Sequence, residues 1–397
     1  MSAPSGCNTV HEVSRRAAIR PPSLANSAVS PRDSQKQKVP DYVKILLDIL
    51  HPAHIHVLRA FREDMIARGH EVHVVARDKD LTLELLERYG ITADIISQQK
   101  SGRVGLLVEW LQRNVKLWRI ARRVKPDVLL GLMGASIAPV GKIMRIPTVV
   151  LYNAENATQT NRVVYPLASV VVTSDSYEGP VNGNHVTHSG YHETAYLHPN
   201  RFTADPNVLR NCGIEPGTWF ALVRFVSWMA SHDVGEEGFT QRGKIELVRR
   251  LSEHGAVYVS SEGPLPPELE KYRLRVPSQD VHHVMAFANI MVGESATMAS
   301  EAAVLGVPAL YIADTSRGYI NEQDQRYGMV RQAAPADLAA ITAGMTELLA
   351  LTKDEVSARH RRMMSDKIDT TSWLIDFVEA RGWEKTWPSA VKPASNS

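Results

Sequence analysis

The sequence predicts an α/β protein made of two Rossmann-like domains whose parallel sheets face a central cleft. Short apolar runs alternate with helical patterns, which is typical of parallel strands joined by crossover helices. The alternation stops over residues 174–216, which are rich in Gly, Pro, His and Asn, and then begins again. A chain of 397 residues is also long enough for two domains.

The first half is predicted to begin at residues 43–48, a continuous apolar run typical of a buried strand. Apolar residues then recur at helical spacing from Ile55 until Gly69, where the helix should end. Gly90 caps the next predicted helix, residues 81–89. The remaining predicted elements of this half are strands at 71–75, 93–96, 127–130, 148–152 and 170–173 and a long helix at 104–124.

The second half repeats this organisation. Strands are predicted at residues 219–223, 257–260, 290–292 and 309–312, and helices at 244–253, 281–288 and 298–305. Two or three further helices should close the chain between residues 335 and 381.

An internal similarity supports two related halves. In each half a strand ends in a glycine, Gly131 or Gly293, and a short helix of small residues follows. The next strand then begins at Pro147 or Pro308. In open α/β sheets the ligand crevice lies at the carboxyl ends of the strands, so these turns should face the cleft.

Composition narrows the function classes. The formal net charge of +2 gives no support for nucleic-acid binding. Cys7 and Cys212 lie too far apart to suggest a disulfide framework, which fits a reducing compartment. No apolar run reaches the roughly 18–20 residues that span a bilayer.

The predicted domains are residues 41–200 and 201–382, between two tails. Residues 1–40 are rich in Arg, Ser and Pro and lack the apolar core of a secretory signal. We expect them to be a disordered extension, although an organelle transit peptide has a similar composition. Residues 383–397 are expected to be a flexible tail.

The strongest local signal is the turn at residues 293–297, between a strand and a helix. Gly293 lets a backbone approach a ligand, and a helix N-terminus presents N–H donors to an anion. We therefore expect Gly293, Ser295, Ala296 and Thr297 to hold a diphosphate. Glu301, one helical turn beyond Thr297, should bind ribose hydroxyls. An ordinary helix cap, with Glu301 solvated or salt-bridged, would explain the same residues.

A second signal follows the strand at residues 219–223. Arg224 lies at its carboxyl end, and the planar guanidinium suits a phosphate. Ser227 and His232 follow in the same loop and are candidate substrate-binding residues. A merely structural loop remains the alternative.

A third signal follows the first strand. Asp48 ends that strand, and His54 and His56 lie at the start of the next helix. A histidine of near-neutral pKa is a natural general base for a sugar hydroxyl, so all three are candidate catalytic residues. The further ligands expected of a metal site are not evident, and we expect no metal. A helix cap or a core histidine is the alternative for either imidazole.

The helix at residues 104–124 allows two interpretations. An apolar stripe with Trp118 is flanked by several Arg and Lys residues, which fits a helix that makes peripheral contact with a membrane. The same stripe also fits the core-facing side of an ordinary amphipathic helix, and we expect this second role.

Residues 224–235, 258–262 and 297–306 resemble an uncharacterised bacterial and archaeal family, domain of unknown function family 354. The resemblance extends from about residue 43 to about residue 331. This family is grouped with GT-B glycosyltransferases and non-hydrolysing UDP-N-acetylglucosamine 2-epimerases, which implies a GT-B-like fold. In the wider group, a segment resembling residues 293–308 binds the nucleotide diphosphate, and a glutamate matching Glu301 binds ribose. The resembling segments also place Glu262 among the expected substrate-binding residues.

The sequence departs from both relatives in its first loop. This loop lacks the Gly-rich acceptor loop of the peptidoglycan N-acetylglucosaminyl transferase and the Gly-Thr-Arg-Pro-Glu type segment of the epimerases. The resemblance therefore implies the fold and the donor site and leaves the reaction open.

The leading hypothesis is a metal-independent glycosyltransferase that uses a nucleotide-diphosphate sugar, such as a UDP-sugar, in cell-surface glycan or glycolipid synthesis. The C-terminal domain would hold the donor and the N-terminal domain would face the acceptor. The alternatives are a nucleotide-sugar 2-epimerase of the same fold and a non-catalytic nucleotide-sugar-binding protein. We expect no cofactor and a cytoplasmic location, with or without contact at the inner face of the membrane.

Overall fold

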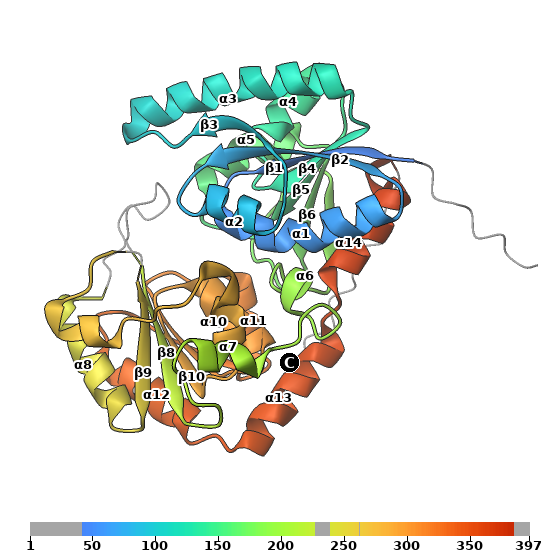
Figure 1. Ribbon diagram of the computed structural model, residues 1–397. Coiled ribbons are helices and arrows are strands. Elements are labelled where there is room, and N and C mark those ends of the chain that lie inside the picture. Colours follow the sequence, from blue (N-terminus) through green and yellow to red (C-terminus); the bar gives the residue numbers. More distant parts are fainter. Residues whose placement is uncertain (1–41, 227–238, 262, 385–397) are drawn as a thin grey trace, which may run out of the picture. The chain divides into compact units, whose positions relative to one another are not determined.

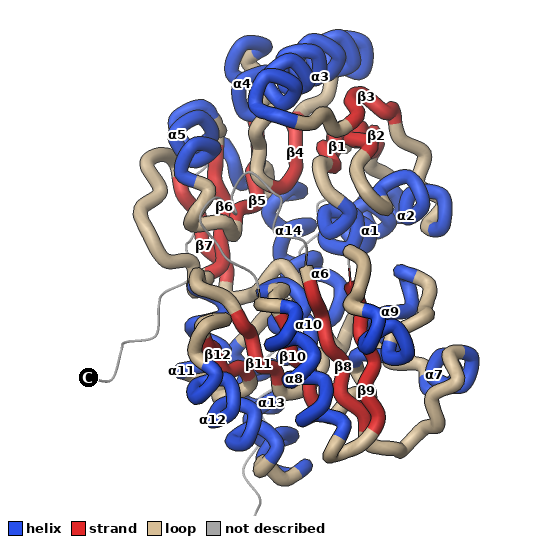
Figure 2. Tube along the Cα trace, turned by 90° about the vertical axis from the view of Figure 1, so that its left-hand side faces the viewer, coloured by secondary structure: helices blue, strands red, loops and turns tan. Residues whose placement is uncertain are grey.

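The computed structural model describes residues 42–226, 239–261 and 263–384, whose strands form two sheets (Figures 1 and 2). Neighbouring strands run parallel throughout both sheets, which confirms the predicted α/β class. By their contacts, the two sheets belong to one compact unit.

The first sheet has seven strands in the order β3-β2-β1-β4-β5-β6-β7. Its strands are β1 (Lys44–Ile49), β2 (Glu71–Asp78), β3 (Asp94–Gln98), β4 (Val128–Leu132), β5 (Thr148–Tyr152), β6 (Val170–Ser174) and β7 (His185–His188). The second has five strands in the order β12-β11-β10-β8-β9. Its strands are β8 (Phe220–Phe225), β9 (Ala256–Ser261), β10 (Ile290–Gly293), β11 (Ala309–Ile312) and β12 (Val330–Ala333).

Helices connect the strands and cover the sheets. In the first half they are α1 (Pro52–Ala67), α2 (Thr82–Arg88), α3 (Gly102–Val124), α4 (Ile137–Met144), α5 (Thr158–Leu167) and α6 (Thr194–Leu197). In the second half they are α7 (Pro206–Asn211), α8 (Gln241–Ser252), α9 (Val281–Met285), α10 (Ala296–Val304), α11 (Gly318–Gln325), α12 (Leu338–Leu349), α13 (Lys353–Asp366) and α14 (Thr370–Glu379). The structure also contains three short 3-10 helices among its described residues: η1 (Pro267–Tyr272), η2 (Ser278–Asp280) and η3 (Gly382–Glu384).

The central strands are buried on both faces because helices cover both sides of each sheet. All five residues of β4, β5 and β6 are buried. This explains why these strands appear in the sequence as apolar runs rather than as alternating patterns.

The strand order of each sheet reverses at one place, between β1 and β4 and between β8 and β10. Ligand crevices of open α/β sheets form outside the carboxyl ends of the strands at such switch points. Asp48 and Gly131 are register partners at the first switch point, and Arg224 and Gly293 are register partners at the second.

The two glycines are required by the same close approach. A Cβ atom on Gly131 would lie 2.8 Å from the carbonyl oxygen of Asp48, and one on Gly293 would lie 2.1 Å from that of Arg224. The internal similarity in the sequence therefore reflects two equivalent close approaches between neighbouring strands. Gly293 serves the packing of β10 on β8 whether or not a phosphate binds nearby.

Three features differ from the sequence-based expectation. Residues 174–216 are not irregular throughout, because they contain the edge strand β7 as well as α6 and α7. The stripe on α3 that was expected to face the core is exposed. The last helix, α14, packs on α1 and α6 of the first half, as Figure 1 shows. The domain boundary near residue 200 stays a prediction.

Candidate functional site

Two of the three residues expected to supply a catalytic base lie in the interior. Asp48 is buried at the end of β1 and forms an ion pair with Arg113 of α3. Burial raises the pKa of Asp48, and the charge of Arg113 opposes this shift only in part. His54 is buried on α1, where its Nδ1 accepts the backbone N–H of Leu50 at 3.3 Å. Burial is the main cause of a pKa of His54 well below its ordinary value.

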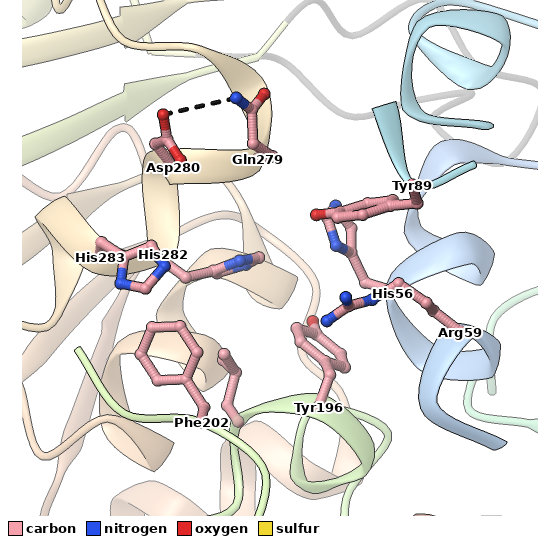
Figure 3. A pocket seen from close by; sticks show the side chains of 10 residues that line it. His56, Arg59, Tyr89, Tyr196, Phe202, Gln279, Asp280, His282 and His283 are labelled. Atoms are coloured by element: carbon pink, nitrogen blue, oxygen red, sulfur yellow. Dashed lines mark hydrogen bonds between the residues drawn. The ribbon is translucent and has the colours of Figure 1, made fainter. Parts of the chain in front are cut away.

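The third residue, His56, lies on the wall of a cavity of about 200 Å³ (Figure 3). Tyr89, Tyr196 and Phe202 contribute aromatic rings to this cavity, and Arg59, Gln279 and Asp280 contribute hydrogen-bonding groups. Ring faces with a few polar groups are typical of small-molecule sites. The cavity is smaller than the roughly 300–1,000 Å³ of sites for drug-sized ligands, so it suits one portion of a larger ligand.

His56 contacts rings that come from distant parts of the chain. Its ring centroid lies 5.1 Å from that of His282, edge to face, and 5.6 Å from that of Tyr196. Burial lowers the pKa of His56 to about 4, with a smaller contribution from His282 and an opposing one from Glu301. The imidazole is therefore neutral at pH 7 and able to accept a proton.

Glu301 of α10 lies behind two of these cavity residues. Its Oε1 accepts the hydroxyl of Tyr196 at 2.6 Å and lies 2.9 Å from Nε2 of His282. Burial raises the pKa of Tyr196 well above its ordinary value, so its hydroxyl keeps the proton that it donates. The structure thus connects His56 and Glu301, two predicted site residues from opposite halves of the chain, through Tyr196 and His282.

The β10–α10 turn has the geometry of a capped helix. The hydroxyl of Ser295 accepts the backbone N–H of Met298 at 3.3 Å, as an N-cap residue does. Ala296 and Thr297 follow in the first turn of α10, both half-buried. Capping and anion binding are compatible, because one side-chain oxygen satisfies only one of the N–H groups at a helix start.

Glu294 of the same turn holds the chain on both sides of residues 227–238. It is buried, it accepts the backbone N–H groups of Val226 at 3.2 Å and Phe239 at 2.7 Å, and it ion-pairs with Lys244 at 3.2 Å. Arg224 donates from Nη1 to the hydroxyl of Ser260 at 2.8 Å. The predicted binding residues Ser227, His232 and Glu262 lie outside the described residues.

Sequence reasoning missed Tyr196, Phe202 and His282. Tyr196 and Phe202 lie in the stretch that was expected to be irregular, so no periodic pattern drew attention to them. The adjacent pair His282 and His283, which follows Asp280 and Val281, was the signal available for the cavity wall.

Within the described part of the chain, no group of three or more His, Cys, Asp or Glu residues is arranged to hold a metal ion. A search of the same residues finds no helix that is long and apolar enough to cross a membrane.

Several solved structures share this fold at low sequence identity. Staphylococcus aureus MnaA, solved with UDP, matches with a TM-score of 0.63 and 12% identity over 88% of this chain and all of that one. The Neisseria meningitidis UDP-GlcNAc 2-epimerase bound to UDP-GlcNAc matches with a TM-score of 0.58 and 13% identity, covering 85% and 100%. The spinosyn rhamnosyltransferase SpnG, solved with the spinosyn aglycone, has a TM-score of 0.57 and 14% identity, covering 86% and 100%. The fold is therefore GT-B-like, as the resemblance implied.

Sequence relatives are uncharacterised. An uncharacterised protein of Methanocaldococcus jannaschii is 21% identical over 279 residues, which cover 67% of this chain and 80% of that protein. Residues 43–196 match the family described as "Protein of unknown function (DUF354)". The match does not include residues 224–235, 258–262 and 297–306, on which the resemblance was based. Over residues 43–196, the chain is therefore similar to this family of unknown function, DUF354.

Proposed function

We propose that the protein binds a nucleotide-diphosphate sugar and transfers its sugar to an acceptor hydroxyl group. The observation that carries this proposal is Glu301, a buried carboxylate that Tyr196 and His282 hold behind the cavity. Glu301 does not itself line the cavity. We propose that its carboxylate accepts hydrogen bonds from ribose hydroxyls that enter between Tyr196 and His282, and that the rings of Tyr89 and Phe202 pack against a base. The cavity volume of about 200 Å³ holds only part of a nucleotide sugar, and we propose that the anomeric carbon lies at the side lined by His56.

The diphosphate would lie at the N-terminus of α10. Ser295 and Glu301 are separated by six residues, or about 9 Å of helical rise. One nucleoside diphosphate can therefore contact both places. The N–H groups and dipole of the helix start would stabilise the negative charge that develops on the departing diphosphate. Arg224, a predicted phosphate-binding residue, lies at the carboxyl end of the neighbouring strand β8, where it is the register partner of Gly293.

His56 is the proposed general base. In the transfer step the acceptor oxygen bonds to the anomeric carbon, the bond from that carbon to the diphosphate oxygen breaks, and the acceptor proton passes to His56. The pKa of His56, lowered to about 4, keeps its imidazole deprotonated at neutral pH and also makes it a weaker base than an ordinary histidine. Asp48 is paired with Arg113 in the interior, so the proposal gives it no part in the proton transfer.

The second candidate is epimerisation, which the structural similarity to UDP-GlcNAc 2-epimerases favours. An epimerase needs two acid–base groups on opposite sides of one sugar carbon. His56 and His282 are the two imidazoles in contact at the cavity, but their ring centroids are only 5.1 Å apart. In the arrangement with the rings in contact, no sugar carbon fits between them, so we propose transfer as the first candidate.

The test is a calorimetric titration with a panel of nucleoside diphosphates, followed by incubation of the matching nucleotide sugars with and without candidate acceptors. Release of the diphosphate that depends on an acceptor supports transfer. Conversion without an acceptor, with one solvent deuteron incorporated at the inverted carbon in heavy water, would identify an epimerase. Binding without any turnover would identify a non-catalytic binder, and no binding at all would overturn the proposal.

A further inference from the structure

Helix α3 exposes its apolar side. Val104 is 76% exposed, Leu107 56%, Leu111 51% and Val115 48%. Together with Val108 and Trp118 they form one stripe along the helix, which we call the α3 stripe. Its spacing of three and four residues places all six side chains on one face. Isolated exposed apolar residues are ordinary, but a continuous row along a 23-residue helix marks an interaction surface.

The opposite side of α3 is polar and is fixed by buried ion pairs. Glu109 accepts from Arg77 at 2.6 and 2.7 Å, and Arg113 pairs with Asp48. Glu109 and Arg113 are 4% and 2% exposed. Turning the helix so that the stripe faced the sheet would separate these charges and leave their partners buried without compensation, which is costly. The outward orientation of the stripe is therefore built into the fold.

The charges beside the α3 stripe have one sign. Arg103, Lys116, Arg119, Arg122 and Arg123 are exposed on the helix, whereas its only carboxylate, Glu109, is buried. Arg123 pairs with the exposed Asp94 at 2.8 Å, and the guanidinium of Arg122 lies 5.5 Å from the Trp118 ring. The neighbouring helix α4 ends in Lys142, the 76% exposed Ile143 and Arg145, and Figure 2 shows it beside α3.

We infer that the α3 stripe and the end of α4 dock on the surface of an anionic lipid bilayer. The apolar row with Trp118 would contact the acyl chains of the lipids. The Arg and Lys residues that border it would contact the anionic headgroups. About 34 Å of helix would lie in the plane of the interface. The surface uses none of the cavity residues, so this inference and the proposed nucleotide-sugar activity can fail independently.

The experiment is co-sedimentation of the full chain with phosphatidylcholine vesicles, with and without phosphatidylglycerol. We expect binding to the anionic vesicles only, and release when roughly 1 M salt shortens the screening length to about 3 Å. The double variant Leu107→Ser/Leu111→Ser should weaken binding by about ten-fold or more, because it removes buried apolar area. The double variant Arg119→Glu/Arg122→Glu should weaken it to a similar degree.

Matched controls are Leu338→Ser on α12, where the leucine is 47% exposed, and Arg242→Glu on α8. Both should bind vesicles as the unaltered chain does. Failure of the unaltered chain to bind anionic vesicles would overturn the inference, as would full binding by both double variants. Loss of binding on deletion of residues 1–40 would also overturn it, since that segment is itself rich in basic residues. So would a protein that is dimeric in solution and becomes monomeric in the Leu107→Ser/Leu111→Ser variant.

Discussion

The ionisation of Glu301 depends on burial and on two neighbouring side chains. Burial raises its pKa, but the charge of His282 and the hydrogen bonds from His282 and Tyr196 outweigh burial, and the pKa is lowered overall. The substitution Glu301→Gln keeps the shape and removes the charge. We expect calorimetry to show affinity for a nucleoside diphosphate reduced by about ten-fold to a hundred-fold, since a hydrogen bond to a charged group is lost.

The matched control for that substitution is Glu347→Gln, which changes a carboxylate on α12 that pairs with Arg331. It should bind nucleotide as the unaltered protein does. Equal affinity in all three proteins would mean that Glu301 serves only the packing of α10.

His56 gives a prediction with a defined pH dependence. His56→Asn should reduce turnover by about a hundred-fold to ten-thousand-fold, the usual contribution of a general base, while nucleotide binding persists. Because the pKa of His56 is lowered to about 4, the basic form persists well below pH 6.5. The kcat/KM of the unaltered enzyme should therefore fall with acidification only near pH 4. An acidic limb near pH 6.5 would point to a different base.

Single residues show which parts of the candidate site can be proposed from position along the chain. His56 and Glu301 were predicted because a histidine after the first strand and a glutamate on the helix after a glycine turn follow from position along the chain. Tyr196 and His282 belong to the site through their proximity to His56 in three dimensions, which position along the chain does not reveal. Asp48 on β1 and His54 on α1 are close to His56 in sequence but lie in the interior, a distinction that depends on the helix face and on Arg113.

At the scale of elements, the pairing of β10 with β8 predicts the effect of changing Gly293. Gly293→Ala would place a Cβ atom 2.1 Å from the carbonyl oxygen of Arg224, so one strand must move. We expect a loss of about 1–3 kcal/mol of stability, measured by denaturant unfolding. Gly105→Ala on α3 is the control, because its nearest neighbour is the Cβ of Lys100 at 3.2 Å and alanine favours a helix. Equal stability of the two variants would contradict this explanation.

Elements were predicted best where apolar runs or helical spacing were strong. The central strands of both sheets follow from such runs. The edge strand β7 was missed because its sequence, His185-Val-Thr-His188, is short and polar, and an edge strand has only one paired side. The helix α3 was found, but its orientation was not. The stripe satisfies the pattern of a core face, whereas the face that packs inward is fixed by ion pairs with residues far away in sequence.

At the scale of the whole molecule, α14 ties the end of the chain to the first half. Leu374, Ile375, Phe377 and Val378 are buried, and Glu379 pairs with Arg68 beyond the end of α1 at 3.1 Å. A chain that stops after residue 368 should therefore lose several kcal/mol of stability. Each kcal/mol lowers the melting temperature by about 1–2 °C in a chain of this length, because the unfolding entropy grows with the number of residues. Calorimetry of a chain that stops after residue 384 provides the control, for which we expect no change. An unchanged melting temperature in the shorter chain would show that α14 contributes nothing to the first half.

The position of α14 also limits how the molecule can move. The chain passes from the first sheet to the second between β7 and β8 and returns between α13 and α14. Two halves joined by one connection can rotate in any direction. Two separate connections restrain this motion, and the rotation that they restrain least is the one about the line through both of them. The cavity would then open and close mainly by rotation about that line. His56 on α1 and His282 on α9 would separate and return along the same arc in every cycle.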